Sequence, residues 1–316
     1  MGRLIEGEWF PGDVNTSSNK GDYQRVPRTF LNAIEKETIF PPETNRYHLY
    51  VSYACPWAHR TLIMRQLKGL QDLISVSVVS PEMMDDGWKF DDTIEGSTID
   101  HLYNYKNLFQ VYKKADSNIS TTVTVPILWD KKHETIVNNE SSEIIRIFNY
   151  AFNDLTNNYD DFYPEKLRAE IDEVNDDIYH NINNGVYKSG FAKNQESYDH
   201  SVKKLFNSLD RLEKVLEGRS FLVGDQMTEA DIRLLPTLIR FDTVYFIHFK
   251  CSIKKISEFK NLSRYLNKHY KLDAIQNTGM HFKLRIPLGY HSRIPLVNLL
   301  EFTLCFSSSI LLGDCI

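Results

Sequence analysis

The sequence predicts an α/β domain followed by an all-helical domain. In the first half, β-branched runs flank one helical pattern in the order strand, helix, strand. From about residue 160 the apolar residues have helical spacing throughout. With 316 residues, the chain is long enough for two domains with a sizeable core.

Composition and charge exclude several classes of protein. Hydrophobic residues make up 42% of the chain and charged residues 25%, as in ordinary globular proteins. A formal net charge of −5 does not favour nucleic acid or an anionic membrane as a partner. Charged residues interrupt the first ten positions, so no signal peptide is expected. The scattered cysteines contain no C-x-x-C pair, which favours a reducing, cytoplasmic location.

Residues 1–46 are rich in Gly, Pro, Asn and charge, and we expect an irregular N-terminal extension packed on the next domain. That domain, 47–155, begins with a predicted strand at Tyr47–Tyr53, a helix at Pro56–Leu70 and a strand at Ile74–Val79. A strand, helix, strand order implies a right-handed crossover that joins two parallel strands.

A polar insertion at about 80–122 interrupts this pattern and contains a predicted helix near His101–Lys113. The run Val123–Asp130 then predicts a strand that Pro126 opens, because proline cannot donate to a sheet ladder and can adopt a cis bond in a tight turn. A hairpin to Thr135–Val137 and an apolar helix complete the domain. This order of elements is that of a thioredoxin-like domain with glutathione-binding features.

The helical domain is predicted over 160–283. Amphipathic patterns indicate helices at Lys166–Asn181, Ser197–Leu216 and Leu262–Tyr270. Another helix should start after Thr228, because a carboxylate three positions on forms a variant of the capping box. Pro236 should kink that helix.

Cys55 is the candidate nucleophile because it lies where the first strand gives way to the first helix. Pro56 suits the first helical position, since its missing N–H would have no intrahelical partner there. The amides of the first turn and the positive end of the helix dipole should then favour thiolate over thiol. The alternative is a small buried hydrophobe, the commoner fate of a lone cysteine.

Ala58 determines which thiol chemistry is open to Cys55. In a two-cysteine redox motif a second thiol at that position would resolve a mixed disulfide internally. Because alanine stands there, the resolving thiol must come from outside, and glutathione is the abundant candidate.

Six ordered motifs resemble the glutathionyl-hydroquinone reductases, which are xi-class glutathione transferases with an omega-like branch in fungi. The motifs lie between about residues 20 and 282, at Ala54–Arg60, Asp86–Trp88, Thr124–Asp130, Ile136–Ile145, Asn184–Ala192 and Val244–Phe249. The resemblance implies a thioredoxin-like domain followed by an all-helical glutathione-transferase domain. It also implies a homodimer, glutathione as co-substrate, and a glutathionylated aromatic or quinone-derived substrate.

The resemblance implies a role for each matching residue. Cys55 would attack the glutathionyl sulfur of the substrate, and Tyr187 would exchange a proton with the leaving carbon. Tyr245 would line the same pocket. Glutathione would be held by Trp88, Thr122, Val123, Thr124, Val125, Glu140 and Ser141.

The residues themselves support some of these roles and leave alternatives open. The backbone of Val125, beside Pro126, can pair with a peptide ligand. Glu140 and Ser141 lie at a helix start, where they can bind the γ-glutamyl group or simply cap the helix. Trp88 could instead anchor a loop, and the two tyrosines could be packing residues. We expect His59 to pack or cap, not to act as a base, because its ring points away from the sulfur.

Three departures from the family pattern stand out. Thr122 replaces an arginine that would contact a glutathione carboxylate, for which Lys113 or Lys114 could substitute, and Leu31 replaces another arginine. After Lys283 the family's tyrosine-rich helix gives way to an atypical tail, 284–316. Its apolar run is shorter than the ~20 residues of a membrane span, so no membrane segment is expected.

Three functions are consistent with these residues. The first is glutathione-dependent reduction of glutathionyl-hydroquinones through a Cys55 mixed disulfide. The second is an omega-like thiol transferase or dehydroascorbate reductase that uses the same cysteine. The third is a non-catalytic binding module with the same fold. The histidines lack paired spacing, so no metal site is expected.

Overall fold

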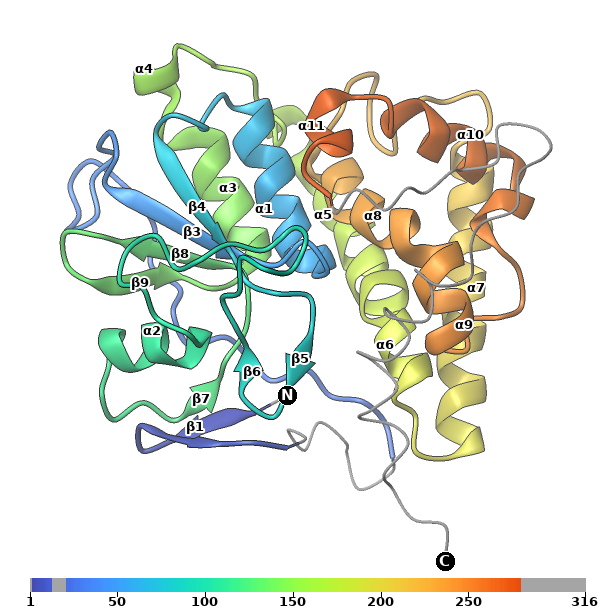
Figure 1. Ribbon diagram of the computed structural model, residues 1–316. Coiled ribbons are helices and arrows are strands. Elements are labelled where there is room, and N and C mark those ends of the chain that lie inside the picture. The colour runs from blue at the N-terminus through green and yellow to red at the C-terminus, as the bar shows by residue number, and fades with distance from the viewer. Residues whose placement is uncertain (1, 13–20, 280–316) are drawn as a thin grey trace, which may run out of the picture.

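A computed structural model describes residues 2–12 and 21–279 of the chain. It confirms the predicted order of an α/β domain followed by a helical domain (Figure 1). The tail 284–316, with its predicted departure from the family pattern, lies outside the described residues.

A four-stranded sheet forms the centre of the α/β domain, in the order β4-β3-β8-β9. Strands β3 (Tyr47–Val51) and β4 (Ile74–Val78) are parallel, as predicted. Strands β8 (Ile127–Asp130) and β9 (Thr135–Asn138) continue the sheet in antiparallel pairs. Every residue of β3 is buried, because both faces of this strand are covered.

Helices cover the sheet. Helix α1 (Pro56–Leu67) packs against α3 (Ser141–Tyr150), and α2 (Leu108–Ala115) contacts β9. Figure 1 shows α1 and α3 together on one side of the sheet and α2 on the other. Asn107 and Gln110 form a capping box at the start of α2, which is why this helix begins later than the predicted His101.

The prediction of an irregular N-terminal extension is wrong for residues 3–10. Strands β1 (Arg3–Ile5) and β2 (Glu8–Phe10) form a hairpin, and β1 also pairs with β7 (Thr121–Thr122) at the end of the insertion. A further hairpin within the insertion joins β5 (Met83–Met84) to β6 (Gly87–Trp88). Strands of two or three residues are too short to show an alternating pattern, so the sequence does not reveal them.

The region after β8 and β9 is helical, as predicted. Its elements are α4 (Asn153–Thr156), η1 (Glu165–Leu167), α5 (Arg168–Asp177), η2 (Ile178–Asn183), α6 (Gly185–Gly190), α7 (Gln195–Val215), α8 (Glu229–Arg240), η3 (Phe241–Tyr245), α9 (Phe246–His248), η4 (Ile256–Glu258), α10 (Lys260–His269) and α11 (Asp273–Gln276). The predicted capping box of Thr228 and Asp231 is present, and α8 continues through Pro236 to Arg240.

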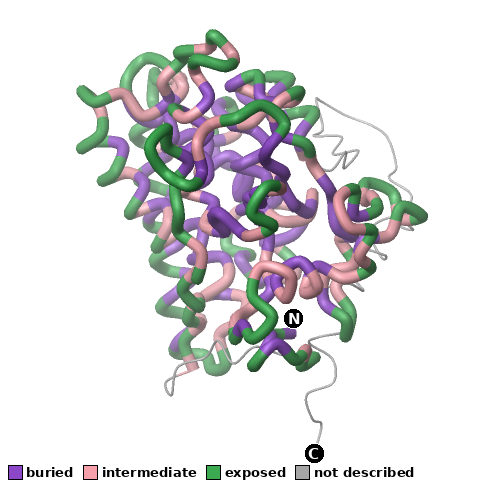
Figure 2. The backbone as a smooth tube through the Cα atoms, turned by 90° about the vertical axis from the view of Figure 1, so that its left-hand side faces the viewer, coloured by how far each residue is buried: buried purple, intermediate pink, exposed green. Residues whose placement is uncertain are grey.

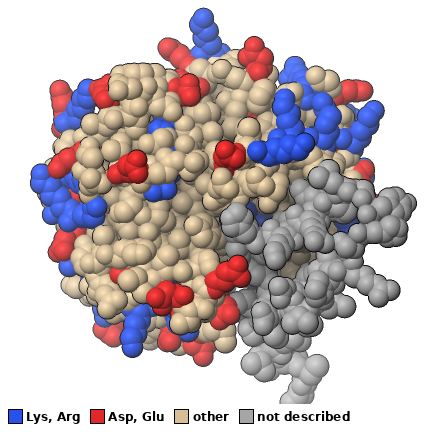
Figure 3. Space-filling model, turned by 45° about the horizontal axis from the view of Figure 1, so that its top comes forward, with Lys and Arg blue, Asp and Glu red and all other residues tan. Residues whose placement is uncertain are grey.

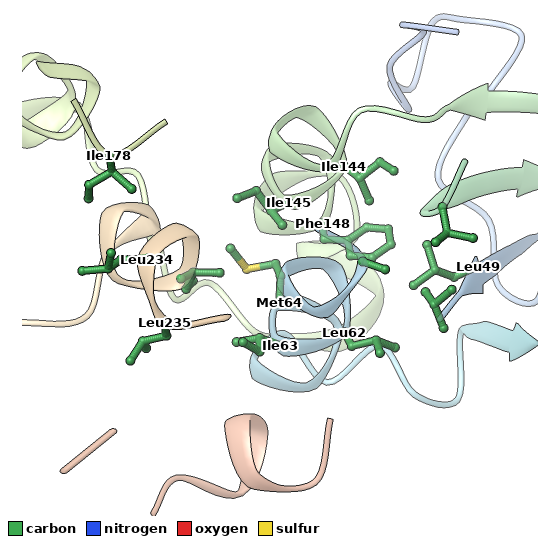
Figure 4. Close-up of a cluster of buried hydrophobic side chains, with 14 of the residues drawn as sticks. Leu49, Leu62, Ile63, Met64, Ile144, Ile145, Phe148, Ile178, Leu234 and Leu235 are labelled. Atoms are coloured by element: carbon green, nitrogen blue, oxygen red, sulfur yellow. The ribbon is translucent and has the colours of Figure 1, made fainter. Parts of the chain in front are cut away.

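Helix α1 joins the two domains. It contacts α3 on the sheet side and α8 on the helical side. In Figure 4, Ile63 and Met64 of α1 lie between the α3 side chains and Leu234 and Leu235 of α8. Figure 2 shows buried backbone concentrated towards the centre of the molecule and exposed backbone at its periphery. The start of α1, and with it Cys55, is therefore placed at the junction of the two domains.

Candidate active site

Cys55 is the N-cap residue of α1. Its backbone is extended, with φ −81° and ψ 118°, and Pro56 occupies the first turn as predicted. The thiol donates to the carbonyl oxygen of Val125, with 3.8 Å between sulfur and oxygen. The residue is partly exposed. The sulfur therefore lies between the start of the helix and the backbone that leads into β8.

Burial opposes the predicted thiolate. It raises the pKa of the Cys55 thiol, although the amides of Ala58 and Trp57 act in the opposite direction. The charges of Arg240 and Arg25 also lower the pKa. The helix amides thus favour the thiolate, as expected from the sequence, but burial outweighs them, so the pKa of the thiol is raised overall.

Tyr187 and Tyr245 lie together beside Cys55, which brings three of the proposed site residues to one place. Tyr187 is on α6 and Tyr245 on η3, with their rings edge to face and 6.1 Å between centroids. Their hydroxyl groups form a hydrogen bond, and each interacts electrostatically with Cys55. Burial raises the pKa of Tyr187 to about 12 and that of Tyr245 well above its ordinary value. Both phenols are consequently neutral near pH 7 and able to donate.

An aromatic wall surrounds Tyr187. Its ring lies 5.4 Å from that of Phe249 and 6.2 Å from those of Tyr23 and Phe191, centroid to centroid. Trp57, in the first turn of α1, lies 6.4 Å from Tyr187. Such a wall suits a flat aromatic substrate, which can stack on its rings or meet them edge to face.

Glu140 caps helix α3, which is the alternative role that the sequence left open for it. Its Oε1 atom accepts hydrogen bonds from the amide and hydroxyl of Ser142 and from the hydroxyl of Ser141. Among the described residues, Oε2 has no hydrogen-bond partner. Burial opposes ionisation of Glu140, but the Ser142 amide and the charges of Arg28 and Arg60 lower its pKa overall. Oε2 of the ionised Glu140 therefore remains free to accept from a ligand while Oε1 caps α3.

The segment before β8 presents backbone groups beside the sulfur. Tyr112 binds the peptide of Thr124, donating to its carbonyl at 2.9 Å. The following peptide bond, Val125–Pro126, is cis. In the described part of the chain, the amide of Val125 has no hydrogen-bond partner, while its carbonyl accepts from Cys55. Val123 is buried, and Thr122 pairs with Arg3 in the three-stranded sheet.

Trp88 lies at the end of β6 and is partly buried against the core. This position is consistent with a loop anchor as well as with a ligand contact. Lys113 and Lys114, considered as substitutes for the missing arginine, face other partners. Lys113 pairs with Glu8 at 3.6 Å and Lys114 with Glu134 at 2.9 Å.

Two arginines near Cys55 escaped the sequence analysis. Arg240 ends α8 and is buried, and Arg25 belongs to the N-terminal segment that we expected to be irregular. The Arg25 guanidinium lies over the rings of Trp57 and Tyr187, 4.2 and 5.2 Å from their centroids. A periodicity argument assigns arginine to the exposed face of a helix, so no sequence signal pointed to Arg240.

His59 packs, as predicted, and is not a base for Cys55. Its ring is buried and bound by Arg240 on one nitrogen and Thr278 on the other. Burial and the charge of Arg240 hold the pKa of His59 well below its ordinary value.

On the face shown in Figure 3 the described surface carries charges of both signs, and the described side-chain clusters do not form a metal site. Figure 3 shows acidic and basic side chains interspersed over one face. Among the described residues, no three His, Cys, Asp or Glu side chains are grouped as metal ligands would be. None of the described helices combines the length and the apolar character needed to cross a membrane.

Comparisons with known proteins identify relatives over most of the chain. Residues 54–150 match the family "Glutathione S-transferase, N-terminal domain", and residues 195–268 match "Glutathione S-transferase, C-terminal domain". The chain is 51% identical over 286 residues to the glutathionyl-hydroquinone reductase YqjG of Escherichia coli (strain K12), covering 88% of this chain and 87% of that protein. It is 50% identical over 262 residues to a glutathione S-transferase omega-like 2 of Schizosaccharomyces pombe. This match covers 80% of this chain and 83% of that protein.

Solved structures agree with these sequence relatives. The glutathione-bound structure of YqjG superposes with a TM-score of 0.78 at 52% identity, covering 82% of this chain and 86% of that one. The glutathione S-transferase Xi of Phanerochaete chrysosporium superposes with a TM-score of 0.82 at 48% identity. The superposition covers 87% of this chain and 94% of that one.

Proposed function

Because this chain belongs to the glutathionyl-hydroquinone reductases, the xi class of glutathione transferases, we propose that it uses glutathione to reduce glutathionyl-hydroquinones. One observation carries the proposal beyond family membership. Three elements distant in sequence bring the thiol of Cys55 and the phenols of Tyr187 and Tyr245 together beneath an aromatic wall.

In the first half-reaction, the Cys55 thiolate attacks the glutathionyl sulfur of the substrate. A sulfur–sulfur bond forms while the bond between that sulfur and the aromatic carbon breaks, and the electron pair of the broken bond goes to the carbon. Tyr187 is a suitable proton donor to that carbon because its raised pKa, about 12, keeps the phenol protonated. Hydroquinone leaves, and Cys55 carries glutathione as a mixed disulfide.

In the second half-reaction, a thiolate of free glutathione attacks the glutathionyl sulfur of the mixed disulfide. Oxidised glutathione leaves and the Cys55 thiolate is restored, while the proton of the incoming thiol replaces the one that Tyr187 donated. The two thiols supply the two electrons that reduce the aromatic carbon. The motif that begins at Cys55 supplies no thiol to resolve the intermediate, since Ala58 stands where the second cysteine of a C-x-x-C pair would be.

The residues beside Cys55 have the chemistry that glutathione requires. The amide of Val125, unpaired among the described residues, can pair with the cysteinyl peptide of the ligand. Oε2 of Glu140 can accept from the γ-glutamyl ammonium, while Ser141 and the amides of α3 can bind its carboxylate. We assign Trp88, Thr122, Val123 and Thr124 to the remaining lining of this site.

Mass spectrometry of the protein after incubation with a glutathionyl-hydroquinone tests the proposal. We expect a glutathione adduct on the peptide that contains Cys55 and release of free hydroquinone. Adding glutathione should remove the adduct and yield oxidised glutathione. Hydroquinone released without an adduct on Cys55 would contradict the mechanism.

An omega-like thiol transferase or dehydroascorbate reductase is the second candidate, because a lone thiol with no internal partner serves those reactions equally well. The paired phenols favour the first candidate, since exchange between disulfides needs no proton on carbon. Turnover of a glutathionyl-hydroquinone compared with that of a glutathione mixed disulfide distinguishes the two. A non-catalytic binding module would show neither activity.

The homodimer and the cytoplasmic location stay predictions of the sequence. Native mass spectrometry of the purified chain tests the first, and fractionation of the source cells tests the second.

A further inference from the structure

Arg240 reaches from the helical domain to the peptides that precede Cys55. Its Nη2 donates to the carbonyl oxygen of Tyr53 at 2.8 Å, and its Nε donates to that of Ala54 at 3.2 Å. Nη1 donates to the carbonyl of Pro236 in its own helix at 2.9 Å. The side chain therefore ties α8 to the turn that carries the nucleophile.

This guanidinium is buried, with 3% of the residue exposed, and has no carboxylate partner among the described residues. A charge removed from water without a counter-ion is costly. The groups that interact with it electrostatically are Cys55 and the phenols of Tyr187, Tyr245 and Tyr270. Of these, the Cys55 thiol ionises most readily, so the positive charge favours an anion at the sulfur.

His59 fixes the position of Arg240. A guanidinium can only donate, so Nδ1 of His59 must accept from Arg240 Nη1 across 3.1 Å. The ring proton of the neutral imidazole is then on Nε2, which donates to the Thr278 hydroxyl at 3.1 Å. That hydroxyl in turn donates to the carbonyl of Ala274 in α11. The chain of bonds joins α8, α1 and α11 and leaves Arg240 one orientation.

We propose that Arg240 is a positioning residue for Cys55, which holds the two peptides before the nucleophile and supplies a buried positive charge that favours its thiolate. The proposal rests on the function proposed above, but its test does not need turnover. The other groups that face the sulfur are the carbonyl of Val125, which accepts from the thiol, the amides of Trp57 and Ala58, Arg25 from the N-terminal segment, and the phenols of Tyr187 and Tyr245.

The test follows alkylation of Cys55 by iodoacetamide as a function of pH, with the Cys55 peptide quantified by mass spectrometry. We expect Arg240→Met to move the midpoint of this profile to higher pH and to slow alkylation at neutral pH several-fold. Arg240→Lys keeps the charge but lacks the planar fork that donates to the two carbonyls from separate nitrogens, so its midpoint should stay near that of the parent while kcat falls. Arg240→Gln replaces Arg240→Met if the latter does not fold, as judged by circular dichroism.

Arg65→Met is the matched control. Arg65 is on the same helix as the nucleophile and also donates to two main-chain carbonyls, those of Ile74 and Gln71, at 2.7 and 2.9 Å. Its loss should leave the Cys55 profile unchanged. An unchanged midpoint in a folded neutral variant of Arg240 would overturn the proposal even if the enzyme still turned over. The parent protein could also fail to reduce a glutathionyl-hydroquinone while Arg240→Met still shifts the alkylation midpoint to higher pH. That result would count against the proposed function and leave the role of Arg240 standing.

Discussion

The sulfur of Cys55 lies 3.8 Å from the carbonyl oxygen of Val125 and donates to it. This contact joins the first helix to the backbone that leads into β8, which is 70 residues away in the sequence. A thiol held beside an open backbone edge can meet the sulfur of a peptide ligand that pairs with that edge.

Cys55→Ser should abolish reduction of a glutathionyl-hydroquinone, because a serine hydroxyl cannot form the mixed disulfide. Hydroquinone release, measured by liquid chromatography, provides the readout. Cys251→Ala is the control, since Cys251 is buried and donates to the carbonyl of Phe249. A Cys55→Ser variant that still turns over would mean that another group attacks the substrate.

Tyr187→Phe should lower kcat roughly 10²-fold with little change in KM, because it removes the proton donor and keeps the ring. Since the pKa of Tyr187 is about 12, the donor stays protonated through neutral pH. Steady-state kinetics with a glutathionyl-hydroquinone measure the effect, and exchange with a glutathione mixed disulfide should be largely spared. Tyr198→Phe removes a hydroxyl that donates to the carbonyl of Lys250, outside the aromatic wall, and should change neither reaction.

Glu140→Gln should weaken glutathione binding about tenfold or more, the amount expected when a charge-assisted hydrogen bond is lost. The amide oxygen can still cap α3, so thermal stability should change little. Calorimetric titration with glutathione measures the affinity. Glu143→Gln, whose parent side chain accepts from Asn138, is the control. If Glu140 only caps the helix, Glu140→Ala will cost ~1 kcal/mol of stability and leave binding intact.

Asp130→Ala should lower the free energy of unfolding by ~3–5 kcal/mol, because it removes the buried partner of Arg46 and leaves only Glu43, which is half-exposed, to pair with the buried charge. The pair is bidentate, with distances of 2.8 and 2.7 Å, and neither side chain is more than 3% exposed. Urea titration measures the loss. Asp154→Ala breaks the exposed pair with Lys36 and should be close to neutral. Equal losses of stability in Asp130→Ala and Asp154→Ala would show that burial of the pair with Arg46 makes no difference to its contribution.

Stability should fall as the pH drops from about 6.5 to about 3, in part through His48. Burial lowers the pKa of His48 from 6.5 to about 3, and its ring bonds Ser75 and Ser77. The unfolded chain therefore binds a proton in this window while the folded chain does not, which costs up to ~1.4 kcal/mol per pH unit from this group.

Urea titrations at a series of pH values test this prediction in His48→Gln. The variant should lose stability less steeply than the parent through the same window. Other buried histidines, such as His59, contribute equally to both proteins, so the difference isolates His48. Parallel curves for the two proteins would show that His48 takes no part.

Part of the site was predictable from neighbours in the sequence. A proline after Cys55 places the cysteine at the start of a helix, and the strands on either side follow from runs of β-branched and aromatic residues. The same local signals placed Glu140 at the start of α3. Tyr187 and Tyr245 were assigned to the site through the family resemblance alone, because their spacing is equally typical of packing residues.

The sequence by itself determined where the nucleophile lies along the chain and which helix begins there, because backbone conformation depends on adjacent residues. Only the tertiary structure decided what surrounds the sulfur. It placed Tyr187, Tyr245, Arg25 and Arg240 around Cys55 from segments far apart in sequence. Burial and electrostatic fields depend on such distant segments, so the pKa of Cys55 is raised where the helix amides alone would lower it.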